Sequence, residues 1–214
     1  ADGHEDRVER ARMLTQDLRP GKKDLPAYSL ARSLWLSRKG RVESDLRVCV
    51  LPDRVLLEVD AIAATRTAST LASFVIMEDC AVRDVSAAFH CLALHGPTAL
   101  ALLSTVFQPE GGAPAIDALP VSGGVTRGAI ADAPVLVIRD DMTGAPGFAL
   151  IAATDHALTV AQAVIRAGHD ATHEAPREGF SLPVLAPEAP RSASRFRLAP
   201  VGWMAFNIAR IEAG

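Results

Sequence analysis

The chain repeats one order of elements, two strands joined by a short turn and then a helix, in two separate places. In the first, "DLRVCVL" and "RVLLEVD" flank a Pro-Asp turn, and a helix is expected from Ala61 to Phe74 with Asp60 as its cap. In the second, "PVLVIRD" and "GFALIAA" flank "DMTGAPG", and a helix opens at Asp155 and stops at Gly168. Hairpins followed by helices predict an α+β fold with mainly antiparallel sheets.

Four further segments have a recognisable pattern. "SLARSLWL" and "HCLAL" have the composition of strands, and "HGPTALALLSTVF" fits a helix with Pro97 at its first position, where a missing N–H does no harm. A basic helix is expected from Asp6 to Leu18. The connections over residues 107–128 and 174–200 are rich in Pro, Gly and Ser, and they predict long surface loops.

The composition excludes several classes of protein. A formal charge of −3 over 214 residues gives no field that would favour nucleic acid or an anionic membrane as a partner. The longest apolar runs are far below the ~18 residues of a membrane span, and the N-terminal "ADGHEDRVER" lacks the apolar stretch of a secretory signal. Three cysteines without a C-x-x-C pair suit a reducing cytoplasm and argue against a disulfide framework or a zinc site.

Common catalytic and metal-binding motifs are missing or weak. "SGGVTRG" lacks the spacing of a phosphate loop, and no serine lies in a G-x-S-x-G elbow. His169 and His173 are four residues apart, as two ligands on one helix face would be, but no third ligand is near them in the sequence. We therefore expect no metal site.

The C-terminal "NIARIEAG" places a carboxylate among apolar residues. On a helix that begins at Val201, Glu212 lies roughly 20° from Val201 at ~100° per residue, on the same face as an apolar stripe. A carboxylate on a buried face is costly unless something donates hydrogen bonds to it. The alternative is that Glu212 lies in a fraying last turn and reaches water. The stripe consists of Val201, Met204, Ala205, Ile208 and Ile211.

A second carboxylate with a specific setting occurs in "RKGRVESDLRV". A Lys-Gly turn feeds a strand, and Asp45 lies at its start beside Ser44 and close to Glu43. Asp45 is either a turn carboxylate at the end of a strand or an acid or base presented at the rim of a sheet. The residues alone leave both interpretations open.

Six segments, in matching order over nearly the whole chain, resemble the folate-binding domain of the glycine-cleavage T-protein (aminomethyltransferase) superfamily, and especially its YgfZ-like branch. They are "DRVERARMLTQDL", "RKGRVESDLRV", "LLEVDA", "ALHGPTALALL", "MTGAPGF" and "PVGWMAFNIARIEAG". The resemblance implies one folate-binding domain over residues 1–214. It also implies an α+β fold with repeated sheet-plus-helix subdomains around a central cavity, which holds tetrahydrofolate or a one-carbon derivative.

The resemblance assigns roles to three carboxylates. Asp45 falls on the aspartate that aminomethyltransferases use beside the folate amine, which would make it the catalytic residue. Asp60 falls where the family has an Asn near the pterin, although its role as a helix cap is equally good. Glu212 falls on the Glu that grips the pterin ring, whose two parallel N–H donors one carboxylate accepts side by side.

The chain also departs from the family pattern. Met142 stands where aminomethyltransferases have a Tyr, and Ala145 stands where they have a Glu. The aromatic residue expected before Asp45 is absent, because an ungapped count gives Arg32, and Tyr28 would need an insertion. These departures weaken the case for aminomethyl chemistry more than the case for folate binding.

The family pattern is also incomplete at both ends of this sequence. It normally has a strand and an apolar segment before "DRV", and after "RIEAG" it continues into a K-G-C-x-x-G-Q-E motif and a β-barrel. The resemblance therefore predicts a fragment or a shortened relative.

Three functions remain open. The first is a tetrahydrofolate-binding protein of the YgfZ-like type that supports iron–sulfur proteins. The second is a tetrahydrofolate-dependent one-carbon transferase in which Asp45 polarises or deprotonates the amine that receives the carbon. The third is a subunit that kept the fold and lost the ligand, as in the gamma subunits of heterotetrameric sarcosine oxidases.

Overall fold

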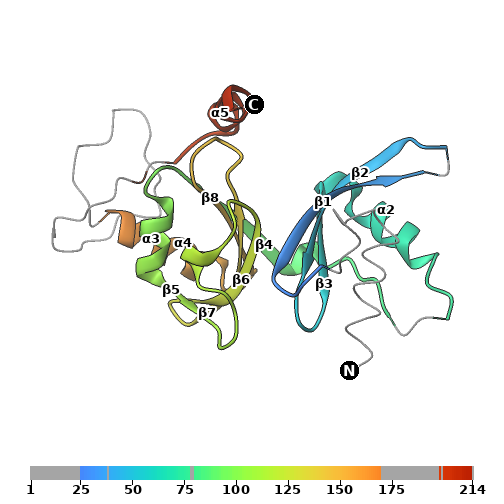
Figure 1. The fold of residues 1–214 in the computed structure, drawn as a ribbon, viewed down its shortest axis with the longest axis horizontal. Coiled ribbons are helices and arrows are strands. Elements are labelled where there is room, and N and C mark those ends of the chain that lie inside the picture. The colour runs from blue at the N-terminus through green and yellow to red at the C-terminus, as the bar shows by residue number, and fades with distance from the viewer. Residues whose placement is uncertain (1–24, 38, 78–79, 170–197, 199, 214) are drawn as a thin grey trace. The chain divides into compact units, whose positions relative to one another are not determined.

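The structure is a computed structural model that describes residues 25–37, 39–77, 80–169, 198 and 200–213. The chain divides into two compact units, which we call unit 1 and unit 2. Figure 1 labels their helices and strands in chain order. Unit 1 comprises Ala1–Phe89 and Ser122–Val125, and unit 2 comprises His90–Val121 and Thr126–Gly214.

Unit 1 is an antiparallel sheet followed by a helix. Its central strand β2 pairs with β1 on one side and β3 on the other. The start of β6 joins β1 through the pair Ser29↔Gly124. The elements are β1 (Ser29–Leu36), β2 (Val42–Val50), β3 (Val55–Val59), α2 (Ala61–Ala72), the 3-10 turn η1 (Ser86–Ala88) and the start of β6 (Ser122–Ile130).

The alternation of side chains along β2 decides which face of the unit 1 sheet forms a core. Leu46 and Val48 are fully buried, whereas Asp45 beside them is exposed, because successive residues of a strand point to opposite faces. Leu71 of helix α2 packs on the face of Leu46 and Val48. The buried cluster of unit 1 consists of Trp35, Leu46, Val48 and Leu71.

Unit 2 contains a larger sheet and two helices that pack against it. The strands lie in the order β6–β7–β8–β4, and β5 pairs with β6. Ala131 and Asp132 join β6 to β7, and their positive φ angles of 50° and 63° make a tight turn. The further elements are β4 (Phe89–His95), α3 (Ala99–Val106), β5 (Phe107–Pro109), η2 (Ile116–Ala118), β7 (Ala133–Asp140), β8 (Gly147–Ala153), α4 (Ala157–His169) and α5 (Trp203–Ala213).

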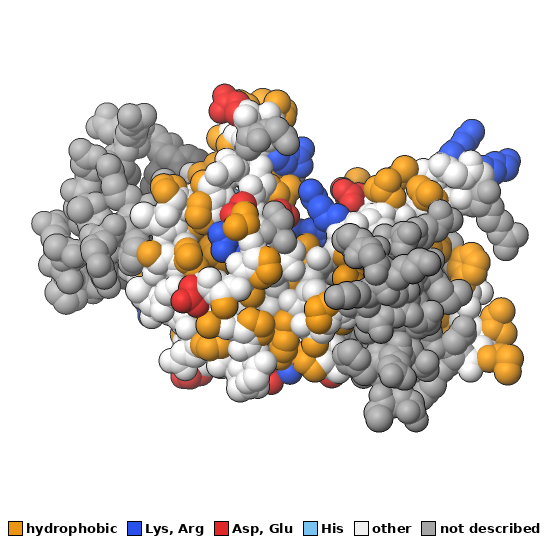
Figure 2. Space-filling view, viewed as in Figure 1, with side chains coloured by type: hydrophobic (Ala, Val, Ile, Leu, Met, Phe, Trp, Pro, Cys, Tyr) orange, Lys and Arg blue, Asp and Glu red, His pale blue; other side chains and the backbone are white. Residues whose placement is uncertain are grey.

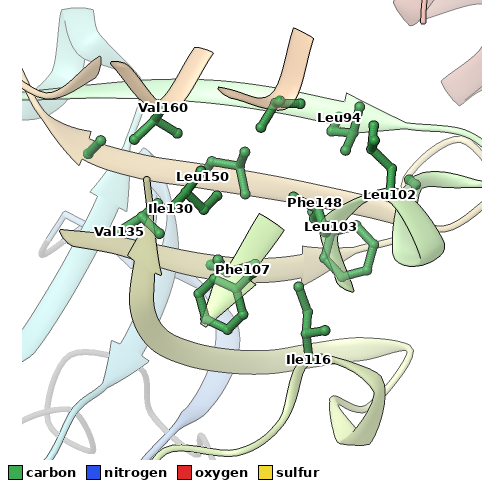
Figure 3. Packing of buried hydrophobic residues seen from close by; sticks show 14 of the residues in the cluster. Leu94, Leu102, Leu103, Phe107, Ile116, Ile130, Val135, Phe148, Leu150 and Val160 are labelled. Atoms are coloured by element: carbon green, nitrogen blue, oxygen red, sulfur yellow. The ribbon is translucent and has the colours of Figure 1, made fainter. Parts of the chain in front are cut away.

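The core of unit 2 draws side chains from the sheet, from α3 and α4, and from η2 (Figure 3). Phe148 of β8 and Leu103 of α3 are fully buried in it, as is Val160 of α4. The labelled residues of this cluster are Leu94, Leu102, Leu103, Phe107, Ile116, Ile130, Val135, Phe148, Leu150 and Val160.

The predicted α+β class is confirmed, and so are both hairpins with a helix after them. The strand predicted at "SLARSLWL" is β1, with the same bounds. Strands β2 and β3 form the first hairpin before α2, and β7 and β8 form the second before α4. The hairpins formed as predicted because their signals, alternating apolar residues and turn residues, are local.

Two predictions about the middle of the chain are wrong. Residues 107–128 do not form one loop, because they contain β5, η2 and most of β6, and they bury Phe107, Ile116 and Leu119. Helix α3 begins after Thr98 rather than at Pro97. The helix predicted from Asp6 to Leu18, and nearly all of the connection over 174–200, lie outside the described residues.

Candidate functional site

Asp45 lies on β2 with its side chain exposed, opposite Leu34 of β1. The two residues before it are held by helix α2. Ser44 is buried, with its hydroxyl 3.0 Å from that of Thr67, and a Glu43 oxygen lies 3.0 Å from the guanidinium of Arg66. These contacts hold the start of β2 against α2, whereas the Asp45 side chain is exposed.

Asp60 caps helix α2, as predicted. Its carboxylate accepts a hydrogen bond from the backbone N–H of Ile62 at 2.9 Å, the usual role of an aspartate at this position. The register of β2 with β3 ends at Leu46↔Val59. Asp45 precedes Leu46 on β2, and Asp60 follows Val59, the last residue of β3. Both predicted site residues therefore lie at this end of the hairpin.

Tyr28 and Arg32 lie before and within β1. Tyr28 is half-buried, and its backbone has a φ of 63°, a left-handed conformation that is unusual for a bulky residue. The Tyr28 N–H donates to the Val50 carbonyl at 2.7 Å, and the Tyr28 carbonyl accepts from Val125 at 3.3 Å, so both backbone groups hold the strained residue in place. Arg32 is exposed and lies directly opposite Arg47 of β2.

Met142 belongs to the turn between β7 and β8, which a buried ion pair braces. The Arg139 guanidinium lies 3.3 Å from the Asp141 carboxylate, which also accepts from the Gly147 N–H at 3.0 Å. Both charged side chains are mostly buried, and the Met142 N–H donates to the Asp140 carbonyl at 2.8 Å. The side chain of Met142 is half-buried, and the hydrogen bond of its backbone N–H holds the residue in the turn.

The sequence did not predict the contacts that His95 makes in unit 2. The His95 ring lies against Phe206 of α5, with centroids 5.1 Å apart, and its Nδ1 atom is buried with no hydrogen-bond partner among the described residues. A Cβ at Gly147 would come within 2.4 Å of that atom, so only glycine fits there. Burial lowers the pKa of His95, while the carboxylates of Asp140 and Asp141 oppose the shift. "HGP" marks a strand end in the sequence, but nothing in it shows that α5 returns to this histidine.

Glu212 is exposed in α5, and so is the apolar stripe that was predicted to be buried. Val201 and Ile211, which define the stripe, are 67% and 74% exposed. The helix instead turns Phe206 toward His95. The expectation of a carboxylate on a buried helix face is therefore wrong, because periodicity shows which residues share a face but not which face packs.

The predicted site residues fall into two groups. Asp45, Asp60, Arg32 and Tyr28 belong to unit 1, whereas Met142 and Glu212 belong to unit 2. The meeting of Asp45 with Glu212 in one cavity therefore stays a prediction.

Cys49 lies on β2, beyond Arg47. Burial raises the pKa of its thiol to about 12, the nearby Glu58 carboxylate adds to the rise, and Arg47 opposes it. A thiol that stays protonated is neither a nucleophile nor a metal ligand at neutral pH.

Neither a cluster of metal ligands nor a membrane-spanning helix occurs in the part of the chain that the structure describes. No group of three or more His, Cys, Asp or Glu side chains gathers there as a set of metal ligands, although His173 and the side chain of His169 are not described. No helix in the same part of the chain has both the length and the apolar character needed to cross a membrane.

Comparison with known proteins identifies a family. Residues 9–175 match the GCVT N-terminal domain, and members of this family are in general folate-binding. No curated protein matches the sequence. A chain in the structure of heterotetrameric sarcosine oxidase from Corynebacterium sp. U-96 in complex with pyrrole 2-carboxylate is similar, with 21% identity, a TM-score of 0.47, and coverage of 82% of this chain and 78% of that one. Since the family match spans well over half of the sequence, the chain belongs to the GCVT N-terminal domain family.

Proposed function

We propose that this protein binds tetrahydrofolate or a one-carbon derivative of it. The observation that carries the proposal is the match of residues 9–175 to a domain family that is in general folate-binding. The exposed Asp45, held on a strand whose other face packs under α2, supports it. The proposal includes the family arrangement, in which sheet-plus-helix subdomains surround the cavity that holds the folate.

In this proposal Asp45 and Glu212 meet different parts of the ligand. Asp45 hydrogen-bonds the folate amine, and Glu212 accepts the ring N–H and amino N–H of the pterin side by side. Both carboxylates are exposed in the described chain, so a ligand would reach them without displacing a partner. Asp60 lies near Asp45 and caps α2, so its part in binding is to hold this end of the hairpin.

Within the family we propose the YgfZ-like type, a protein that supports iron–sulfur proteins rather than turning over glycine. The segments "KGRVESDL" and "GWMAFNIARIEAG" resemble that branch. Met142 and Ala145, in place of the Tyr and Glu of aminomethyltransferases, support binding without aminomethyl transfer.

The main alternative is a subunit with the same fold and no ligand. The exposed Glu212 favours it, because a solvated carboxylate on the last turn of a helix needs no pterin. A one-carbon transferase is supported by Asp45, which is exposed and suitably placed to act as an acid or base.

Calorimetric titration with tetrahydrofolate and 5-formyltetrahydrofolate tests the proposal. Glu212→Gln should weaken binding about ten-fold or more, because an amide replaces one acceptor by a donor that faces a donor, at a cost of about 1.5–3 kcal/mol. Asp45→Asn should spare most of the affinity and abolish any one-carbon transfer.

Asp117→Asn, an exposed carboxylate in η2, is the matched control and should change nothing. No binding by the parent chain would favour the ligand-free subunit. Equal binding by the parent and Glu212→Gln would remove Glu212 from the site.

A further inference from the structure

One face of the unit 1 sheet carries a row of charged residues beside the exposed Asp45. Residues opposite each other in paired strands share a face, and the register places Arg32 opposite Arg47, and Arg47 opposite Glu58. Leu34 follows Arg32 by two residues on β1, so it points to the same face, and it lies opposite Asp45 of β2. The other face, with Leu46 and Val48, is the one that packs under α2.

The two arginines and two carboxylates of this face have a net charge of zero, but among the described residues only Arg47 and Glu58 form an ion pair with each other. Arg47 forms an ion pair with Glu58, and both side chains are largely buried, so this guanidinium is already neutralised. Arg32 is exposed, and no ion pair or hydrogen bond to its side chain is found within residues 25–37, 39–77 and 80–169. Two cations opposite each other across strands repel, so an anion beside Arg32 would be stabilised.

The residues next to Arg32 indicate which kind of anion fits. Leu34 is 48% exposed and presents an apolar surface between Arg32 and the position of Asp45. Arg32 and Leu34 are two residues apart on β1, or about 7 Å along the strand. A ligand that lies along this face would meet a carboxylate, then an apolar side chain, then a guanidinium. An aromatic amine that continues into a carboxylate has this order of groups.

We propose that Arg32 binds a carboxylate of the glutamyl tail of the folate, with the aminobenzoyl ring over Leu34 and the amine at Asp45. This inference rests on the proposed function, and it names a residue that determines which folates bind. The planar guanidinium of arginine matches a carboxylate with two parallel N–H donors. An aromatic side chain at this position would stack on the ligand but would not distinguish a ligand with a carboxylate from one without.

The test compares two ligands that differ only in the tail. Affinities of the parent chain, Arg32→Gln and Arg83→Gln are measured for 5-formyltetrahydrofolate and for 5-formyltetrahydropteroate, which lacks the glutamate. Arg83 is an exposed arginine elsewhere in unit 1, so its variant is the control for a lost positive charge. Arg32→Gln should weaken binding of the glutamate-bearing ligand by about three- to ten-fold, since exposed charge pairs are modest.

The same variant should leave the affinity for the pteroate unchanged, and Arg83→Gln should change neither affinity. Added salt should weaken binding of the glutamate-bearing ligand by the parent chain more than by Arg32→Gln. If Arg32→Gln weakens both ligands equally, or neither, Arg32 does not contact the tail and the inference is overturned. If the parent chain binds neither ligand, the proposed function fails and the inference falls with it.

Discussion

The two units differ in how much core supports their sheets. Among the described residues, unit 1 buries a cluster of four side chains under one helix, whereas the cluster of unit 2 contains sixteen. Unit 1 nevertheless holds four of the six predicted site residues, and three of them, Arg32, Asp45 and Asp60, are exposed. Within the described residues, unit 1 therefore combines a small buried cluster with a polar face that a ligand could reach.

Figure 2 shows both hydrophobic and charged side chains on the visible face of the molecule. The ion pair of Arg139 with Asp141 in unit 2 is mostly buried and braces a turn. In unit 1, the Glu43–Arg66 pair leaves the arginine 74% exposed, and such a pair adds little to stability. The Arg47–Glu58 pair of unit 1 is largely buried as well. Only the exposed charged residues of unit 1, such as Arg32 and Asp45, are therefore candidates for recognition.

The largest expected effect is the loss of Phe148 from the core of unit 2. Phe148→Ala should lower the free energy of unfolding by about 3–5 kcal/mol, since it leaves a cavity where a fully buried ring was packed. Urea denaturation measures the change. Leu158→Ala, at an exposed position of α4, is the control and should stay within about 0.5 kcal/mol of the parent. A similar loss at both positions would contradict the assignment of this core.

A smaller effect on stability is expected in the four-residue buried cluster of unit 1. Leu46→Ala removes a fully buried side chain and should cost about 2–4 kcal/mol, toward the lower end because the small cluster can relax. Hydrogen exchange should show faster exchange in β1, β2 and β3, with the amides of β7 and β8 still protected. Equal loss of protection in both units would show that they unfold as one, and the comparison would fail.

The sequence predicted the elements whose signals are local and missed those that depend on distant contacts. The sequence of β6 is "SGGVTRGAI", and its glycines are the reason that a loop was predicted there. A Cβ at Gly128 would lie 2.1 Å from the Gln108 carbonyl and 2.7 Å from the Phe107 ring, so glycine is required by the pairing of β5 with β6. Glycine inside a strand often marks such a close approach, but the partner cannot be read from the chain.

For the candidate site, too, only the features that depend on neighbouring residues could be predicted from the sequence. The role of Asp60 as a cap follows from neighbouring residues and is confirmed. Asp45 was predicted at the start of a strand, but β2 begins at Val42, so Asp45 lies inside the strand. The exposure of Glu212 could not be predicted, because α5 packs through Phe206 against His95, which lies more than a hundred positions away in the chain. The contact of His95 with α5 was not predicted, for the same reason.

The cap of α2 gives a third test, which separates the effect of the cap from that of the charge at Asp60 in unit 1. Asp60→Ala removes the acceptor of the Ile62 N–H and should cost about 0.5–2 kcal/mol of stability. Asp60→Asn keeps an oxygen at the cap and should stay close to the parent, since Asn caps helices about as well as Asp. Thermal unfolding of both variants measures this. If the Asn variant is as unstable as the Ala variant, the charge rather than the cap is what matters at this position.

The smallest expected effect is the pH dependence that His95 gives to unit 2. Burial lowers its pKa below the ordinary value of 6.5, so in the folded chain the ring stays neutral to a lower pH than in the unfolded chain. Between these two values the unfolded state binds more protons, and stability therefore rises with pH. The contribution is fully present above about pH 6.5 and is lost as the pH falls through the folded value.

Replacing His95 by Gln should flatten this part of the curve of stability against pH, while the lost ring contact with Phe206 lowers stability equally at every pH. His90→Gln, on the same strand but exposed, is the matched control and should keep the slope of the parent. Denaturant midpoints at half-unit steps between about pH 5 and 7.5, a range that brackets the ordinary histidine value, give the comparison. A parent curve that rises toward acid pH in this window, and loses that rise in His95→Gln, would mean that Asp140 and Asp141 outweigh burial at this histidine.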